Sequence, residues 1–172
     1  DRHADINARD RSNHTPLHHA SMKGHHQSIE RLLAYGPDIN ALDIHGQTPL
    51  HLTSAKGHHQ CIELLLDRQA DINALERTDY GTPLHYAATS GHHQCVELLL
   101  DRHADINARN YYNFTPLHLA SMKGHHQSIE RLLAYGPDIN ALDIHGQTPL
   151  HLTSAKGHHQ CIELLLDRHA DI

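Results

Sequence analysis

The sequence lacks any apolar run close to the roughly 20 residues that a membrane-spanning helix requires. It also lacks a surplus of basic residues. The formal net charge is −6 at pH 7, whereas binding to phosphate groups needs a stripe of Lys and Arg. No secretory signal is visible, although the chain begins at Asp1 rather than Met, so a cleaved leader stays open. We therefore expect a soluble protein whose partner is neither a membrane nor a nucleic acid.

A recurring tetrapeptide organises the chain. Thr-Pro-Leu-His begins at Thr15, Thr48, Thr82, Thr115 and Thr148, at intervals of 33, 34, 33 and 33 residues. A period of this length is typical of a stack of small units, none of which can bury a core alone. Such a stack encloses no cavity by default, so we expect a binding surface rather than a reaction centre.

Each unit is expected to contain two helices. Thr can cap a helix whose first position is Pro, where the missing N–H costs nothing. The first helix then ends at a glycine such as Gly57, the residue type that reverses a helix end most easily. In the second helix, Ile62, Leu65 and Leu66 recur at helical spacing and form an apolar stripe toward neighbouring helices.

These residues resemble the ankyrin repeat. A complete unit runs from Asp43 to Leu75 and contains Thr-Pro-Leu-His, Gly57-His58 and the segment Ala-Asp-Ile-Asn-Ala. The resemblance covers the single array 1–172, with a partial unit (1–9), four full repeats (10–42, 43–75, 76–109 and 110–142) and a truncated repeat (143–172). It implies an all-α, curved solenoid of stacked helix-turn-helix units with β-hairpin fingers, which binds other proteins and has no catalytic activity.

Cysteine is scarce, and its three copies occupy the same second-helix position in three repeats. Equivalent positions in neighbouring repeats would lie about 10 Å apart, which is beyond the reach of a disulfide. We expect Cys61, Cys95 and Cys161 to be reduced, partly buried packing residues. This favours an intracellular, cytoplasmic setting, although the sequence leaves the compartment unknown.

A second, longer period relates residues 1–72 to residues 101–172, which differ at only six positions. The pairs are Asp10/Asn110, Arg11/Tyr111, Ser12/Tyr112, His14/Phe114, His19/Leu119 and Gln69/His169. Four of the six fall within one five-residue turn, the exposed tip of a finger, where side chains are available to a partner. We interpret the pattern as a recent duplication or an engineered array with altered contact residues. The alternative is that finger tips tolerate any substitution.

The altered finger is aromatic in a chain that has no Trp, six Tyr and one Phe. Tyr111, Tyr112 and Phe114 replace Arg, Ser and His of the matching repeat, and a core position rarely accepts Arg in place of Tyr. We therefore expect all three to be largely exposed and to bind a partner, because exposed aromatics give much contact area for little entropy cost. The alternative for Phe114 is that it packs against its own hairpin.

The other fingers and the first helices are expected to complete a concave binding face. Its further candidate residues are Arg11, Ser12, His14, Ile44, His45, Gln47 and Tyr80 from the fingers, and Met22, Lys23, Met122 and Lys123 from the helices. The third finger contains one residue more than the others, between Leu75 and Thr82, and we expect it to bulge with Tyr80 near its tip.

Histidine is abundant, with 22 residues that recur mostly in the tetrapeptide and in adjacent pairs such as His58-His59. Adjacent histidines on a helix point to different faces, and equivalent ones in neighbouring repeats lie about 10 Å apart, so neither arrangement converges on an ion. In ankyrin repeats such histidines usually hydrogen-bond to backbone groups. We expect structural histidines, no metal site and no cofactor, with stability lost between about pH 6.5 and 4.5.

No metalloprotease, phosphate-loop or Cys-x-x-Cys motif occurs, and translated identical units do not bring catalytic groups together. The sequence therefore predicts a non-enzymatic scaffold for a protein partner of unknown identity. The alternative is a structural element that self-associates head to tail, because the chain starts and stops within repeats and its last second helix is as apolar as the internal ones.

Overall fold

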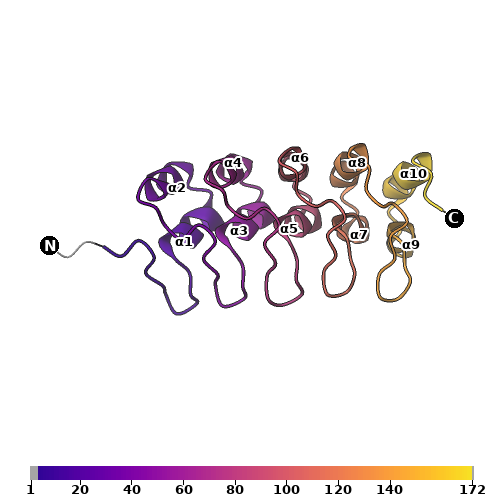
Figure 1. Ribbon diagram of the computed structural model, residues 1–172. Helices are drawn as coiled ribbons and strands as arrows, with labels where there is room; N and C mark the ends of the chain where they lie inside the picture. The colour runs from indigo at the N-terminus through magenta and orange to yellow at the C-terminus, as the bar shows by residue number, and fades with distance from the viewer. Residues whose placement is uncertain (1–3, 172) are drawn as a thin grey trace.

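The computed structural model describes residues 4–171, which form ten α-helices in five consecutive pairs (Figure 1). The first helices of the pairs are α1 (Pro16–Lys23), α3 (Pro49–Lys56), α5 (Pro83–Ser90), α7 (Pro116–Lys123) and α9 (Pro149–Lys156). The second helices are α2 (His26–Leu33), α4 (His59–Asp67), α6 (His93–Asp101), α8 (His126–Ala134) and α10 (His159–Asp167). The two sets form two rows along an elongated array. Residues 1–3 of the partial first unit and Ile172 of the last unit lie outside the described residues.

Each first helix begins with a reciprocal cap between Thr and His. In α5, the Thr82 hydroxyl accepts the backbone N–H of His85, and the His85 Nδ1 atom accepts the backbone N–H of Thr82 at 3.1 Å. This is a capping box in which His takes the place that Glu or Gln usually occupies. Pro83 follows the cap, at a position where its missing N–H is not needed. The expected helix starts are confirmed.

Glycine ends each first helix, and at the first four of these helices it is needed for two reasons that Gly91 illustrates. Its backbone is left-handed, with φ of 75°, a conformation that residues with a Cβ atom rarely adopt. A Cβ atom at this position would also lie only 2.7 Å from the Nδ1 atom of His125, which belongs to the next repeat. The loop therefore needs glycine both for its own turn and for the close approach of its neighbour.

The hydrophobic core runs through the whole array between the two helix rows. Its fully buried members include Leu17, Leu50, Leu84 and Leu117 from the first helices and Ile29, Ile62, Val96 and Ile129 from the second. Cys61, Cys95 and Cys161 are free thiols within this core. Burial raises the pKa of the Cys95 thiol to about 12, so it acts as a small apolar side chain rather than as a nucleophile.

Histidine side chains join each repeat to the next. The Nδ1 atom of His85 accepts a backbone N–H, so the ring proton resides on Nε2, which donates to the Phe114 carbonyl at 2.9 Å. His51 donates in the same way to the Gly81 carbonyl at 3.0 Å, and His118 to the Gln147 carbonyl at 3.1 Å. Each of these imidazoles therefore caps its own helix and holds the following finger.

A second set of histidines makes the opposite connection. The Nε2 atom of His92 lies 3.1 Å from the carbonyl of Ala55, and that of His125 lies 2.9 Å from the carbonyl of Thr89. These are the first residues of the histidine pairs, and they reach back to the end of the preceding first helix. Each internal interface is therefore bonded from both sides, as the resemblance to ankyrin repeats implied.

The fingers are closed turns, and no strand occurs within residues 4–171. In the second finger, the Asp43 N–H donates to the Gln47 carbonyl at 3.0 Å and the Gly46 N–H donates to the Asp43 carbonyl at 3.1 Å. Neighbouring fingers share a single backbone hydrogen bond, such as the one from Arg77 to His45 at 2.9 Å. One bond per interface is too few for a sheet, so the expected β-hairpins are present as loops. Within the same residues, no helix is long and apolar enough to cross a bilayer.

We predict that acid destabilises the fold through its buried histidines. Burial lowers the pKa of His51, His85 and His118 from the usual 6.5, and that of His85 reaches about 4. Between pH 6.5 and the lowered pKa of each histidine, the unfolded chain binds protons that the folded chain excludes. Unfolding therefore becomes more favourable as the pH falls. The pKa shift of His85 alone corresponds to a loss of roughly 3 kcal/mol in the free energy of unfolding once the pH has fallen below about 4. Asp79 has the opposite effect, because its pKa is raised to about 6 and the folded chain binds this proton before the unfolded chain does. Its protonation offsets part of the loss of stability below about pH 6. Urea unfolding at pH 7.5, 6, 5 and 4 measures the effect, and a constant midpoint contradicts it.

We also predict that the hydrogen bond between repeats, rather than the cap, carries most of the contribution of these histidines. His151 caps Thr148 as His85 caps Thr82, but its ring is exposed and within residues 4–171 meets no carbonyl of a following repeat. His85→Gln should lower the free energy of unfolding by about 2–3 kcal/mol, and His151→Gln by about 1 kcal/mol or less. Equal losses in urea titrations would show that the cap alone matters.

Candidate functional site

Five loops form one side of the array and precede the five first helices. They comprise residues 10–14, 43–47, 76–81, 110–114 and 143–147. Figure 1 shows them side by side beyond the first helices, on the side away from the second helices. Each loop leads directly into the threonine that caps its helix, so the loops and the first helices form a continuous surface. We call this surface the finger face.

A side-chain oxygen at the first position holds each finger closed. The Asp43 Oδ1 atom accepts hydrogen bonds from the backbone N–H groups of His45 at 2.9 Å and Gln47 at 2.8 Å. Asn110 accepts equivalent bonds from Tyr112 and Phe114 at 3.0 and 2.9 Å. Asp and Asn favour turns of this kind. Because the first residue supplies the closing bonds, the tip residues can vary without loss of the turn.

The third finger is longer by one residue and uses a longer side chain to close. The Glu76 carboxylate accepts the backbone N–H groups of Thr78, Asp79 and Gly81 at 2.6, 2.7 and 3.4 Å. A hydrogen bond to Glu76, together with burial, raises the pKa of Asp79 to about 6. Tyr80 takes a left-handed backbone with φ of 58°, and its side chain is 49% exposed. The longer finger therefore remains ordered and presents an aromatic side chain.

The fourth finger presents the densest group of aromatic side chains. Tyr111 is 64% exposed and Tyr112 is 44% exposed, with their rings edge to face at 5.3 Å between centroids. The expectation that Phe114 is also largely exposed is wrong. Phe114 is half-buried, and its ring lies 5.8 Å from that of His118 in α7. The last finger residue faces the histidine of its own tetrapeptide, so this position is partly a packing position.

The remaining candidate residues differ in exposure. Arg11, Lys23, Ile44, His45 and Lys123 are exposed, whereas Ser12, His14, Met22, Gln47 and Met122 are half-buried. Gln47 is already engaged across a repeat boundary, because its side-chain N–H donates to the Tyr86 hydroxyl at 2.8 Å. The exposed members are thus the better candidates for direct contact.

A groove of about 460 Å³ lies where helices α3, α5 and α7 meet the third and fourth fingers. Its walls include Lys56, Asp79, Tyr86, Asn110 and Leu119. Sequence reasoning assigned no site to Tyr86 or Leu119, although both occupy the position four residues after the cap threonine, which varies among the repeats. Burial raises the pKa of Tyr86 to about 12, so its hydroxyl stays protonated and can both donate and accept.

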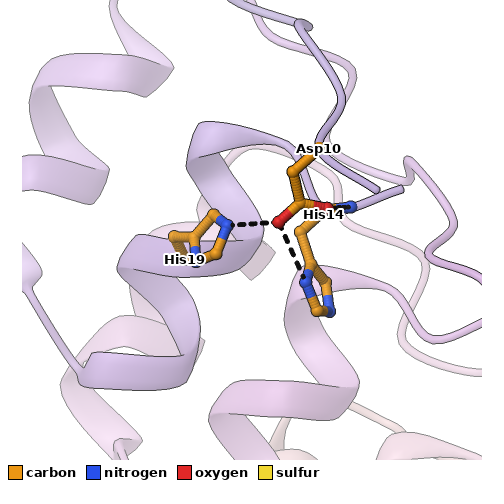
Figure 2. A group of neighbouring side chains, drawn as sticks. All are labelled: Asp10, His14 and His19. Atoms are coloured by element: carbon orange, nitrogen blue, oxygen red, sulfur yellow. Dashed lines mark hydrogen bonds and ion pairs between the residues drawn. The ribbon is translucent and has the colours of Figure 1, made fainter. Parts of the chain in front are cut away.

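The first finger brings together three polar side chains (Figure 2). The Oδ2 atom of Asp10 lies 2.9 Å from the Nε2 atom of His19 in α1 and 3.6 Å from the Nδ1 atom of His14. We expected that no histidines would converge on one point, because adjacent histidines face different ways and equivalent histidines of neighbouring repeats lie too far apart. His14 and His19 are neither adjacent nor equivalent. The three residues belong to the positions that differ between the 100-residue copies, and they converge within one repeat.

The fold agrees with a comparison of the chain with protein-family models. The model described as Ankyrin repeats (3 copies) matches residues 2–76, 30–110, 74–143 and 110–172. No curated protein matches the sequence. The overlapping matches extend over nearly the full length of the chain and together include all five helix pairs. The chain therefore belongs to the ankyrin repeat family.

Proposed function

We propose that the protein is a non-catalytic scaffold that binds a protein partner through its finger face. Ankyrin repeats generally mediate protein–protein interaction. The observation that carries the proposal is the exposed pair Tyr111 and Tyr112, which stands where the nearly identical first copy has Arg11 and Ser12. Exposed aromatic side chains on an otherwise polar surface are typical of interaction sites.

The aromatic pair belongs to a longer apolar strip. The backbone N–H of Tyr111 donates to the Asp79 carbonyl, and that of Ile144 donates to the Tyr112 carbonyl, so the third, fourth and fifth fingers lie next to one another. Tyr80 and Ile144, both 49% exposed, flank the pair on either side. A partner with a complementary apolar segment would cover these side chains together, which is how a small number of residues comes to dominate binding energy.

The scaffold supports binding by limiting the entropy that association costs. The finger tips are held by side-chain turns, and each finger after the first is also held by a histidine of the preceding repeat. A surface that is already ordered loses less conformational freedom when a partner binds. The same order accounts for the difference between the two copies, because tip residues can change while the supporting bonds stay the same.

The origin and setting that we propose follow from the sequence pattern. An engineered or recently duplicated array explains why the differences between the copies cluster at the first and fourth fingers. The buried, unpaired thiols favour a reducing, intracellular compartment. The net charge of −6 makes a protein a better partner than a nucleic acid.

We predict that giving the fourth finger the residues of the first weakens partner binding. The variant Tyr111→Arg, Tyr112→Ser and Phe114→His should fold normally, because the chain already carries these residues at the equivalent positions. Affinity capture with mass spectrometry identifies the partner, and a titration should then show binding weakened at least tenfold, about 1.4 kcal/mol or more.

Tyr35→Ala is the matched control for this experiment, because it removes a tyrosine that is 79% exposed but lies after α2, outside the fingers. Unchanged binding by the triple variant, with an intact circular dichroism spectrum, would rule out the aromatic finger as the site. Sedimentation velocity at rising protein concentration tests the alternative role, head-to-tail self-association.

A further inference from the structure

We propose that Asp10, His14 and His19 form a binding site for a divalent transition-metal ion, with Zn²⁺ as the best match. Two imidazoles and one carboxylate are a ligand set that zinc prefers, and three protein ligands leave a position for water. Within residues 4–171, this is the group of His, Cys, Asp and Glu side chains whose donor atoms come within 4.8 Å of one another. Figure 2 shows both rings beside the same carboxylate oxygen.

The turn of the first finger orients the Asp10 carboxylate for this role. Its Oδ1 atom accepts the backbone N–H groups of Ser12 at 2.8 Å and His14 at 2.9 Å. The Oδ2 atom is left to face the two histidines. The backbone hydrogen bond from His14 is the largest cause of the low pKa of Asp10, about 2, and the bonds from His19 and Ser12 lower it further, so the carboxylate is ionised across the physiological range. One oxygen thus fixes the group, while the other faces both imidazoles and is hydrogen-bonded to His19, whose proton a bound cation would replace.

A buried carboxylate from the next finger orients His14. The Nε2 atom of His14 lies 3.4 Å from Oδ2 of Asp43, a residue that is 1% exposed. The Oδ1 atom of Asp43 is already occupied by its own finger, so Oδ2 is the oxygen available to the ring. A ligating histidine typically donates its second ring N–H to such a carboxylate, which fixes the tautomer and makes the other nitrogen a better ligand. Here that other nitrogen is Nδ1, which faces Asp10.

The distances and exposures allow an ion to enter. Ligands bound tetrahedrally at 2.0–2.1 Å lie about 3.4 Å from one another, so the donor atoms would need to move by roughly an ångström. The His19 side chain is 57% exposed and that of Asp10 is 43% exposed, so both have room for this adjustment. The carboxylates of Asp10 and Asp43 also supply negative charge on either side of His14.

The second copy of the finger lacks the site but keeps its surroundings. Asn110, Phe114 and Leu119 replace the three ligands, while the orienting carboxylate recurs as Asp143. The Oδ2 atom of Asp143 is buried and has no hydrogen-bond partner among the described residues, because Phe114 has taken the place of the histidine. Half of the six differences between the copies therefore remove the proposed ligands together. The chain thus contains both the site and its own ligand-free counterpart.

The test is Zn²⁺ binding by the full chain, measured in competition with a chromophoric chelator. The expected result is one site per chain that is distinct from the weak background of the other histidines. Asp10→Asn and His19→Leu should each weaken this site at least tenfold, whereas His159→Ala, which removes an exposed histidine elsewhere, should leave it unchanged. Asn and Leu already occupy the equivalent positions 110 and 119, so both variants should fold, which circular dichroism checks.

The reverse experiment builds the site in the second copy. Asn110→Asp, Phe114→His and Leu119→His together should raise the stoichiometry from one to two Zn²⁺ per chain, with similar affinities, because Asp143 is in place to orient the new histidine. Co²⁺ provides a second readout, since a low-symmetry His and carboxylate site gives visible absorption that loosely bound ions lack. Binding that is unaffected by Asp10→Asn and His19→Leu, or a triple variant that gains no site, would show adventitious surface binding only and overturn the proposal.

Discussion

The fold depends on a neutral imidazole that uses both of its nitrogens. In each complete interface, the Nδ1 atom of the tetrapeptide histidine accepts the N–H of the cap threonine, and Nε2 donates to a carbonyl of the next finger. One side chain thus begins a helix and joins two repeats. A charged imidazole could not accept at Nδ1, so the same arrangement that stabilises the array also ties it to the pH. A buried donor left without its acceptor would cost more than the bond itself contributes.

The residues that support the fingers are separate from the residues that the fingers present. The turns are closed by Asp10, Asp43, Glu76, Asn110 and Asp143 at the first position, and the tips make few bonds of their own. The helices after the first and fourth fingers accordingly have equivalent bounds, Pro16–Lys23 and Pro116–Lys123, although the fingers differ at four positions. The array can therefore carry an aromatic surface in one copy and a polar, histidine-containing surface in the other without a change in the scaffold.

Much of the architecture was predictable because it rests on local geometry. Thr-Pro marks a helix start, a glycine ends that helix, and the apolar stripe of the second helix defines the buried side. The exposed state of Tyr111 and Tyr112 followed from their replacement by Arg and Ser in the other copy. The half-burial of Phe114 did not, because it depends on the position of the His118 ring. The groove beside Tyr86 likewise forms only when three helices and two fingers come together.

By itself, the sequence determined the repeat length, the start and end of each first helix, the packing role of the cysteines and the location of the variable tips, since each of these follows from the local repeat pattern. The tertiary structure decided that the fingers are closed loops rather than strands, because that depends on how many bonds cross from one finger to the next. It also decided that Asp10 and His19, nine residues apart, share a hydrogen bond, and that Asp43, from the following repeat, faces His14. Contacts between repeats are set by the spacing and rotation of whole units, which no short segment of sequence specifies.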